Sequence, residues 1–301
     1  MVARLWLAAL ALVLLAPLAT AKSPLVLYTD FGTADGAVAA MKGVAYGVSQ
    51  ELVITDLSHE YPGSLFAGAY RLYQVENYWP RGTVFVSVID PGVGTERLSV
   101  VLKTRTGNYF VSPNNGLLTL VAERDGIEEL RQIDESVNRL PGSLDSNTFH
   151  GRDVFGYTGA RLAAGAISFE QVGPRLPPAA LVSLPYRKAE RRGASVSGII
   201  PVLDVQYGNV WSNIPKALFD ELGLKLGDRV RVRIAHGGRP VTELVAPYRR
   251  TFGEVPVGAP LVYVNSLLSL AVALNQGNFA AARKVGSGTD WSIELTPAAA
   301  R

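Results

Sequence analysis

The alternation of short apolar runs with helical patterns in the first half of the chain constrains its fold more than any other feature. Five runs rich in β-branched and aromatic residues are typical of buried strands: residues 25–28, 52–54, 83–89, 99–102 and 109–111. Three intervening segments have helical spacing and few helix-breaking residues: 37–48, 64–75 and 117–124. This alternation predicts an α/β domain with a mainly parallel sheet over residues 22–172.

The sequence changes character after residue 172. Residues 173–193 begin with Gly-Pro-Arg-Leu-Pro-Pro and become highly charged, which indicates a linker. From residue 194 onward, short alternating segments separated by turn signals replace the helical patterns: 196–205, 229–235, 242–246, 261–265 and 291–295. They predict a second, smaller domain over residues 194–301, an antiparallel β-barrel.

The first 21 residues have the pattern of a cleavable secretory signal peptide. Arg4 supplies the positive start, residues 5–15 the apolar core, and Ala19-Thr-Ala21 the small-residue cleavage site. The apolar run is too short to cross a bilayer comfortably as a permanent helix. We therefore expect cleavage between Ala21 and Lys22 and a periplasmic or secreted mature chain, with no membrane association after cleavage.

Charge and cysteine content exclude several classes of function. The formal net charge is +3, and it becomes +2 without the first 21 residues, which carry one arginine and no acid. A value so close to zero gives no electrostatic basis for binding nucleic acid or an anionic membrane. The chain has no cysteine, which excludes disulfides, thiolate catalysis, cysteine metal ligands and cysteine acylation.

Two glycine-containing segments carry the residues best suited to chemistry. They are Asp90-Pro-Gly-Val-Gly-Thr-Glu-Arg97 and Thr148-Phe-His-Gly-Arg-Asp153. Carboxylate and imidazole form a proton-handling pair, and arginine can hold a carboxylate ionised and oriented. Asp-Pro-Gly alone is also ordinary turn chemistry with a surface ion pair. The two segments together favour a reactive site.

Acidic residues also follow the predicted strands. Asp30, Asp56 and Asp90 each come within two residues of a strand end, and ligands of such folds bind beyond the carboxyl ends of strands. Asp30 suits the two vicinal hydroxyls of a ribose, because a carboxylate accepts both hydrogen bonds. Asp35 is either a ligand-binding residue or the N-terminal cap of the helix at 37–48.

Seven motifs in one order resemble the S-adenosyl-L-methionine hydroxide adenosyltransferase family, the hydrolytic relatives of the fluorinase and chlorinase. The resemblance covers nearly all of the mature chain and is carried by these motifs: Thr29-Asp-Phe-Gly-Thr-Ala-Asp35, Met41-Lys-Gly43, Asp90 to Arg97, Asn114-Asn-Gly-Leu-Leu118, Thr148 to Asp153, Gly208-Asn-Val-Trp-Ser-Asn213 and Asn275-Gln-Gly-Asn278.

The resemblance implies a fold, a reaction and an assembly. The fold is an N-terminal α/β domain with a C-terminal β-barrel, assembled as a homotrimer that binds substrate between one subunit's N-terminal domain and a neighbour's barrel. The reaction is displacement at C5′ of S-adenosyl-L-methionine by a water-derived oxygen, which yields adenosine and methionine. S-adenosyl-L-methionine is the substrate, and no cofactor is implied.

The resemblance also assigns the site residues. The family's catalytic triad falls on Asp90, Arg97 and His150, in which Asp90 and His150 would hold and deprotonate the water. Eight further positions fall on substrate contacts: Asp30 for the ribose; Asp35, Asp204 and Ser266 for the methionyl part; Asn209 for adenine; Trp211 and Phe252 as apolar walls; and Phe149 beside the catalytic histidine.

Two other functions are compatible with the same scaffold. The fluorinase has tyrosines at the counterparts of Asp90 and His150 and an inserted loop that is absent here between Leu98 and Asn108. A halogenase is therefore the weaker alternative, because water needs a base and a halide does not. An exported adenosine- or S-adenosyl-L-methionine-binding protein without turnover is the second alternative, which needs no water-activating triad.

Several residues fall outside these assignments. Leu267, Leu268 and Ala271 differ from the family pattern near the expected methionyl carboxylate, so they bear on substrate affinity. His59 is predicted to line the rim or to pack locally, and His236 to lie in a turn of the barrel. No metal site is expected, because no second histidine lies at ligand spacing.

Overall fold

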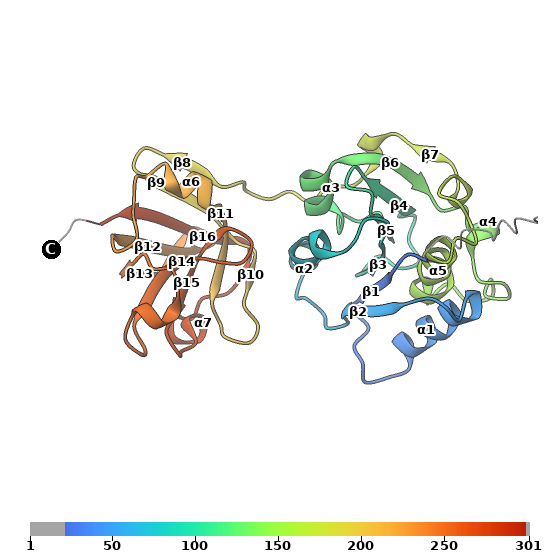
Figure 1. The fold of residues 1–301 in the computed structure, drawn as a ribbon, viewed down its shortest axis with the longest axis horizontal. Coiled ribbons are helices and arrows are strands. Elements are labelled where there is room, and N and C mark those ends of the chain that lie inside the picture. The colour runs from blue at the N-terminus through green and yellow to red at the C-terminus, as the bar shows by residue number, and fades with distance from the viewer. Residues whose placement is uncertain (1–21, 299–301) are drawn as a thin grey trace, which may run out of the picture.

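The computed structural model describes residues 22–298, which form two domains joined by one extended segment (Figure 1). The predicted signal peptide lies outside the described residues. No helix in residues 22–298 combines the length and the apolar character needed to cross a membrane.

A seven-stranded mixed sheet organises the N-terminal domain. Its strand order is β2 (Ile54–Ser58), β1 (Leu25–Thr29), β3 (Val84–Val88), β5 (Tyr109–Pro113), β4 (Ser99–Thr104), β6 (Ile127–Gln132) and β7 (Arg175–Leu176). The first four strands pair in parallel, and the last three extend the sheet by antiparallel pairing. The predicted α/β class with a mainly parallel sheet is confirmed.

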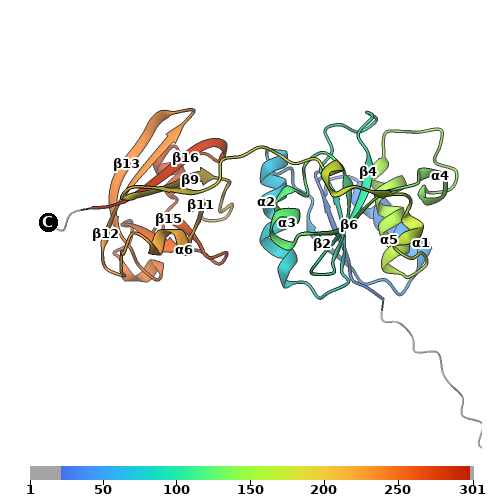
Figure 2. The ribbon, with the colours of Figure 1, turned by 90° about the horizontal axis from the view of Figure 1, so that it is seen from above.

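Helices cover both faces of this sheet (Figure 2). One face carries α1 (Ala37–Val48), α5 (Tyr157–Ala163) and a π-helical turn (Gly151–Gly156), and the other carries α2 (Leu65–Val75) and α3 (Thr119–Asp125). The apolar run of strand β1 is unbroken because both faces of the strand are buried. Leu25 and Leu27 enter the core under α1 and α5, whereas Val26 and Tyr28 enter the core under α2 and α3.

Short elements complete the N-terminal domain and its exit. They are η1 (Glu76–Tyr78), α4 (Glu135–Asn138), η3 (Glu170–Val172) and η4 (Pro178–Ala180). Within the range 173–193 suggested as a linker, β7 still pairs with β6, and β8 (Glu190–Arg192) pairs with the second domain. The stretch between η4 and β8 is the extended crossing visible in Figure 1.

Two antiparallel sheets form the C-terminal domain. One has the order β13 (Arg239–Pro247), β12 (Arg229–His236), β16 (Gly288–Pro297), β9 (Ser195–Ile200) and β8, and the other β10 (Val202–Leu203), β11 (Val210–Pro215), β15 (Ser269–Leu274) and β14 (Pro260–Val264). Tyr248, just after β13, bridges to Val262 of β14 and joins the sheets at one edge. Short helices α6 (Lys216–Asp220) and α7 (Phe279–Arg283) and the turn η5 (Phe252–Glu254) flank them. The predicted antiparallel β domain is confirmed.

The second domain packs on the side of the first that carries α2 and α3. The apolar core on that side continues into Ile199, Val202 and Leu261 of the C-terminal domain. Arg71 of α2 donates from Nη2 to the carbonyl oxygen of Leu203 at 2.9 Å. Contacts within one chain therefore leave the opposite face of the N-terminal domain, with α1 and α5, free of the barrel (Figure 2).

The second strand begins later than the sequence predicts. The apolar residues 52–54 were expected to form it, but β2 spans Ile54–Ser58 and is half-exposed at the edge of the sheet. Its position follows from parallel pairing with β1, in which Asp56 lies opposite Leu27. The expectation that Asp56 follows a strand end is therefore wrong, because this residue lies inside β2.

Candidate active site

Adjacent parallel strands bring two acidic residues to the same edge of the sheet. Asp30 follows β1 and Asp90 comes two residues after β3, and these strands pair directly in register. Burial raises the pKa of the Asp30 carboxyl, and the negative charge of Asp90 adds to that increase. The carboxyl-end rim of the sheet is therefore an acidic, partly desolvated surface.

Arg97 joins Asp90 to His150. Its Nε lies 3.2 and 3.0 Å from Oδ1 and Oδ2 of Asp90, and its Nη2 lies 2.5 Å from Oδ2. The same Nη2 lies 3.1 Å from Nδ1 of His150. The side chains of Arg97 and Asp90 are only 10% and 5% exposed, so this is a shielded, forked ion pair. The structure thus brings the three residues of the expected triad together.

The contact with Arg97 defines the state of the imidazole. A guanidinium has only donors, so Nδ1 of His150 accepts and, in the neutral ring, Nε2 carries the proton. Burial, followed by the charge of Arg97, lowers the pKa of His150, while the charges of Glu135 and Asp90 act in the opposite direction. His150 is neutral at pH 7, and its buried Nε2 has no hydrogen-bond partner in residues 22–298.

Phe31 packs the Asp30 loop against the segment that carries His150. Its ring meets Phe149 edge-on, with centroids 5.6 Å apart. A Cβ at position 151 would lie 2.5 Å from Cζ of Phe31, so a side chain there would displace this ring. Through this contact, the predicted ribose-binding residue and the imidazole belong to one packed unit.

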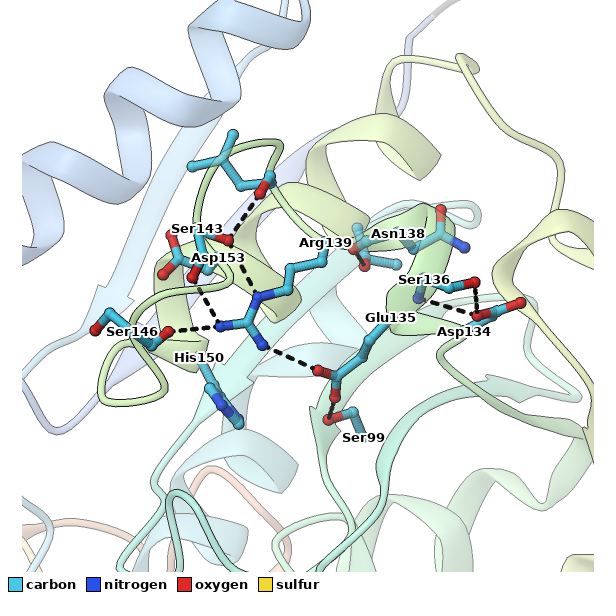
Figure 3. A network of polar contacts seen from close by, with 12 residues as sticks. Ser99, Asp134, Glu135, Ser136, Asn138, Arg139, Ser143, Ser146, His150 and Asp153 are labelled. Atoms are coloured by element: carbon cyan, nitrogen blue, oxygen red, sulfur yellow. Dashed lines mark hydrogen bonds and ion pairs between the residues drawn. The ribbon is translucent and has the colours of Figure 1, made fainter.

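Three residues that the sequence did not single out adjoin the triad (Figure 3). Ser99 accepts a hydrogen bond from Nη1 of Arg97 at 3.1 Å and donates to Oε1 of Glu135 at 3.0 Å. Glu135 in turn accepts from Arg139 at 3.3 Å. The only sequence signal for them is the i,i+4 spacing of Glu135 and Arg139, which is common on any helical surface.

Five of the other predicted residues gather in a cavity of the C-terminal domain. It has a volume of about 940 Å³ and is lined by Asp204, Asn209, Trp211, Phe252 and Ser266, with Tyr263 and Asn265 beside them. Tyr263 and Asn265 were missed, and no sequence signal marks them. Phe252 packs on Tyr263, with ring centroids 5.0 Å apart, and burial raises the pKa of Tyr263 to about 12.

Polar groups of this cavity are available to a ligand. The Nδ2 of Asn209 donates to Asp204 at 3.1 Å, which leaves its Oδ1 as an acceptor. The buried Nδ2 of Asn265 makes no hydrogen bond within the described part of the chain. An aromatic slot edged by a few amide groups suits a flat, hydrogen-bonding ring.

The two groups of predicted residues stay apart in one chain. The cavity is lined only by residues of the C-terminal domain, and none of the rim residues Asp30, Asp90, Arg97 and His150 lines it. Asp35 is exposed, and its Oδ1 accepts from the backbone N–H of Ala37 at 2.9 Å, so its observed contact is at the start of α1.

The other singled-out residues have local contacts. His59 lies 2.7 Å from Oγ1 of Thr29 and 3.1 Å from Asp56, and His236 pairs with Asp290 at the surface. Three residues of the expected methionyl region differ in environment: Leu267 packs on the core between the domains, Ala271 is buried, and Leu268 is exposed at φ 57°. Within residues 22–298, no group of three or more His, Cys, Asp or Glu side chains could hold a metal ion.

Comparison with known families gives one consistent result. Residues 25–173 match the SAM hydroxide adenosyltransferase N-terminal domain, and residues 198–292 match the SAM hydroxide adenosyltransferase C-terminal domain. An (R)-S-adenosyl-L-methionine hydrolase from Salinispora arenicola is 37% identical over 84% of this chain and 90% of its own length. A protein of the same name from Thermus thermophilus is 36% identical over 85% of this chain and 93% of its own.

More distant relatives and a solved structure agree with this result. A fluorinase from Actinopolyspora mzabensis is 28% identical over 84% of this chain and 90% of its own. The crystal structure of an uncharacterized conserved protein from Thermotoga maritima superimposes with a TM-score of 0.82 at 36% identity. That match covers 90% of this chain and 99% of the other.

His150→Gln should make the stability of the protein less dependent on pH. The pKa of His150 is lower in the folded chain than its ordinary value of 6.5, so the unfolded chain binds more protons. The free energy of unfolding therefore falls as the pH drops from 6.5 towards the lowered pKa, and glutamine removes that contribution. Urea unfolding at about pH 8 and about pH 5.5 measures it. If the free energy of unfolding fell equally between these pH values in wild type and in His150→Gln, the neutral, buried state of the imidazole would be contradicted.

Proposed function

The chain belongs to the SAM hydroxide adenosyltransferase family, and we propose that it hydrolyses S-adenosyl-L-methionine to adenosine and methionine by attack of water at C5′ of the ribose. The observation that carries this proposal is the shielded Asp90–Arg97–His150 arrangement beside Asp30. The names of the relatives that share most of the chain's length support the same reaction.

The main task of the protein in this reaction is to position and activate one water molecule. The sulfonium is an excellent leaving group, so methionine departs with the electron pair of the C5′–S bond and needs no general acid. What remains is to strip one water of its solvent partners, align it opposite that bond and accept its proton. A rim of buried carboxylate and imidazole groups supplies these functions.

We assign different tasks to the two groups that face the water. His150 donates from Nε2 and holds the water oxygen, because its Nδ1 is occupied by Arg97. Asp90 accepts the proton, since Oδ1 meets only Nε of Arg97 and keeps a free lone pair. This differs from the expectation that both groups deprotonate the water. As the new C5′–O bond forms, the proton moves to Asp90 and then to solvent.

The substrate's other parts have matching partners. Asp30 would accept hydrogen bonds from both ribose hydroxyls at the rim. The adenine ring would stack in the cavity between Trp211 and Phe252, with Asn209 at its polar edge. Phe149 would line the ribose side, and Asp35, Asp204 and Ser266 would contact the methionyl part, as the family resemblance implies.

We further propose a homotrimer in which each active site combines the rim of one subunit with the cavity of its neighbour. The support is that these two groups of residues occupy separate domains of one chain and do not line a common cavity there. We also infer export from residues 1–21; a mature chain starting elsewhere than near Lys22 would count against it.

A halogenase is the second candidate, since fluorinases are among the relatives. The buried Asp90 argues against it. A halide needs no base, so the Asp90 carboxylate, whose side chain is 5% exposed, would have no role in halogenation.

Hydrolysis in heavy-oxygen water tests the reaction directly. If water attacks C5′, the label enters the 5′-hydroxyl of adenosine, and methionine stays unlabelled. Mass spectrometry of the products separates this from attack on the methionyl side, which releases methylthioadenosine, and from glycosidic cleavage, which releases adenine. Chloride or fluoride added in parallel controls for halogenation. A halogenated nucleoside, adenine or methylthioadenosine as the main product would refute the assignment.

Subunit mixing tests the shared site. His150→Ala removes the group that holds the water, and Phe252→Ala removes a stacking wall, at a cost of about 1–3 kcal/mol in binding. Each variant alone should be nearly inactive at low substrate concentration. In co-expressed mixed trimers, about one site in four combines two unmodified halves, so about a quarter of wild-type activity should return. If the mixture is no more active than the separate variants, each site belongs to one chain.

A further inference from the structure

We propose that Glu135 and Arg139 are positioning residues for the water-activating groups: Arg139 holds the loop that leads to His150, and Glu135 connects Arg139 to Arg97 through Ser99. The inference rests on the proposed function, because it concerns the same triad. No motif marks these residues, and neither contacts the groups to which the substrate would bind.

The connection begins at Arg97. Its Nε and Nη2 are occupied by Asp90 and His150, so Nη1 alone faces away from the triad. That nitrogen donates a hydrogen bond to Oγ of Ser99, which is 4% exposed. The Ser99 hydroxyl in turn donates a hydrogen bond to Oε1 of Glu135. A hydroxyl between a guanidinium and a carboxylate has one direction of donation, so this chain of hydrogen bonds fixes the plane of Arg97.

Arg139 organises the loop between α4 and His150 (Figure 3). Its Nε donates to Oγ of Ser143 at 3.1 Å, and its Nη2 donates to the carbonyl oxygens of Ser143 and Ser146 at 3.1 and 2.6 Å. The remaining nitrogen, Nη1, binds Oε2 of Glu135. The Arg139 side chain is only 7% exposed, although it lies in an irregular segment. All three of its nitrogens hold backbone or side-chain oxygens, a pattern that a single ammonium group does not reproduce.

These contacts close a ring around the imidazole. From Arg97 the path runs through Ser99, Glu135 and Arg139 into the loop, and the loop returns to His150, whose Nδ1 meets Arg97. His150 is thus located from two sides: by its ring nitrogen and by the backbone that precedes it. Positioning by several rigid contacts is what alignment of a reacting water requires.

The two residues also act on the charge of His150 with opposite sign. Four charged groups influence its pKa: Arg97 and Arg139 lower it, whereas Glu135 and Asp90 raise it. Removing Glu135's charge should therefore lower the pKa of His150 further, and removing Arg139's charge should raise it. Simple loosening of the site would instead expose the ring, which moves the pKa towards the ordinary value of 6.5 in every variant.

The test is a histidine titration by nuclear magnetic resonance on wild type, Glu135→Gln and Arg139→Gln. The chain has three histidines, so His150 is assigned by comparison with His150→Gln. We expect the His150 pKa to fall in Glu135→Gln and to rise in Arg139→Gln. A change of the same sign in both, or none, would overturn the inference. Glu135 is 36% exposed, so its variant should stay folded even if Arg139→Gln does not.

Turnover separates position from charge. Arg139→Lys keeps the charge but cannot bind all the oxygens that Arg139 holds, so the His150 pKa should stay near wild type while kcat falls by up to about 10²-fold with little change in KM. Asp220→Asn, which breaks an exposed i,i+4 ion pair with Lys216, is the matched control. It should change neither the pKa of His150 nor kcat. Wild-type kcat in Arg139→Lys would refute positioning. A wild type that fails to hydrolyse S-adenosyl-L-methionine would refute the proposed function alone, because the titration does not depend on activity.

Discussion

The guanidinium of Arg97 is the group on which the rest of the site depends. It is a rigid, permanently charged fork with donors on three nitrogens, and here they bind Asp90, His150 and Ser99. Because it only donates, each partner must present an acceptor. The carboxylate is thereby oriented, the neutral imidazole is held as one tautomer, and the hydroxyl is turned towards Glu135. A lysine in its place has a single ammonium nitrogen and cannot reproduce this planar fork.

The fold brings hydrogen-bond acceptors from distant parts of the chain together around the guanidinium of Arg97. Parallel pairing of β1 and β3 brings Asp30 and Asp90 to one rim. Arg97 lies at the same rim because the antiparallel β4, which begins at Ser99 opposite Pro113 of β5, starts there. The π-helical turn then directs His150 inward. Apolar cores on both sheet faces hold these strands and fix the positions of the charged groups at their ends.

Much of this arrangement could be predicted from residue patterns, and the exceptions share a physical cause. Continuous apolar runs predicted β1 and β3, because both strands are buried on both faces. The predicted bounds of the edge strand β2 were wrong, because its limits depend on its pairing partner rather than on its own hydrophobicity. Asp90, Arg97 and His150 were predicted from glycine-containing motifs. Ser99, Glu135 and Arg139 were not, because their association exists only after β4 and α4 pack together.

The contact between Phe31 and Gly151 gives the site a property that no single residue has. The ring of Phe31 fills the space that a side chain at 151 would occupy, so the loop after β1 packs directly on the turn after His150. The cost of arranging the proposed ribose-binding and water-holding groups would then be met once, when the chain folds. Such preorganisation would leave little reorganisation energy in the encounter with a ligand.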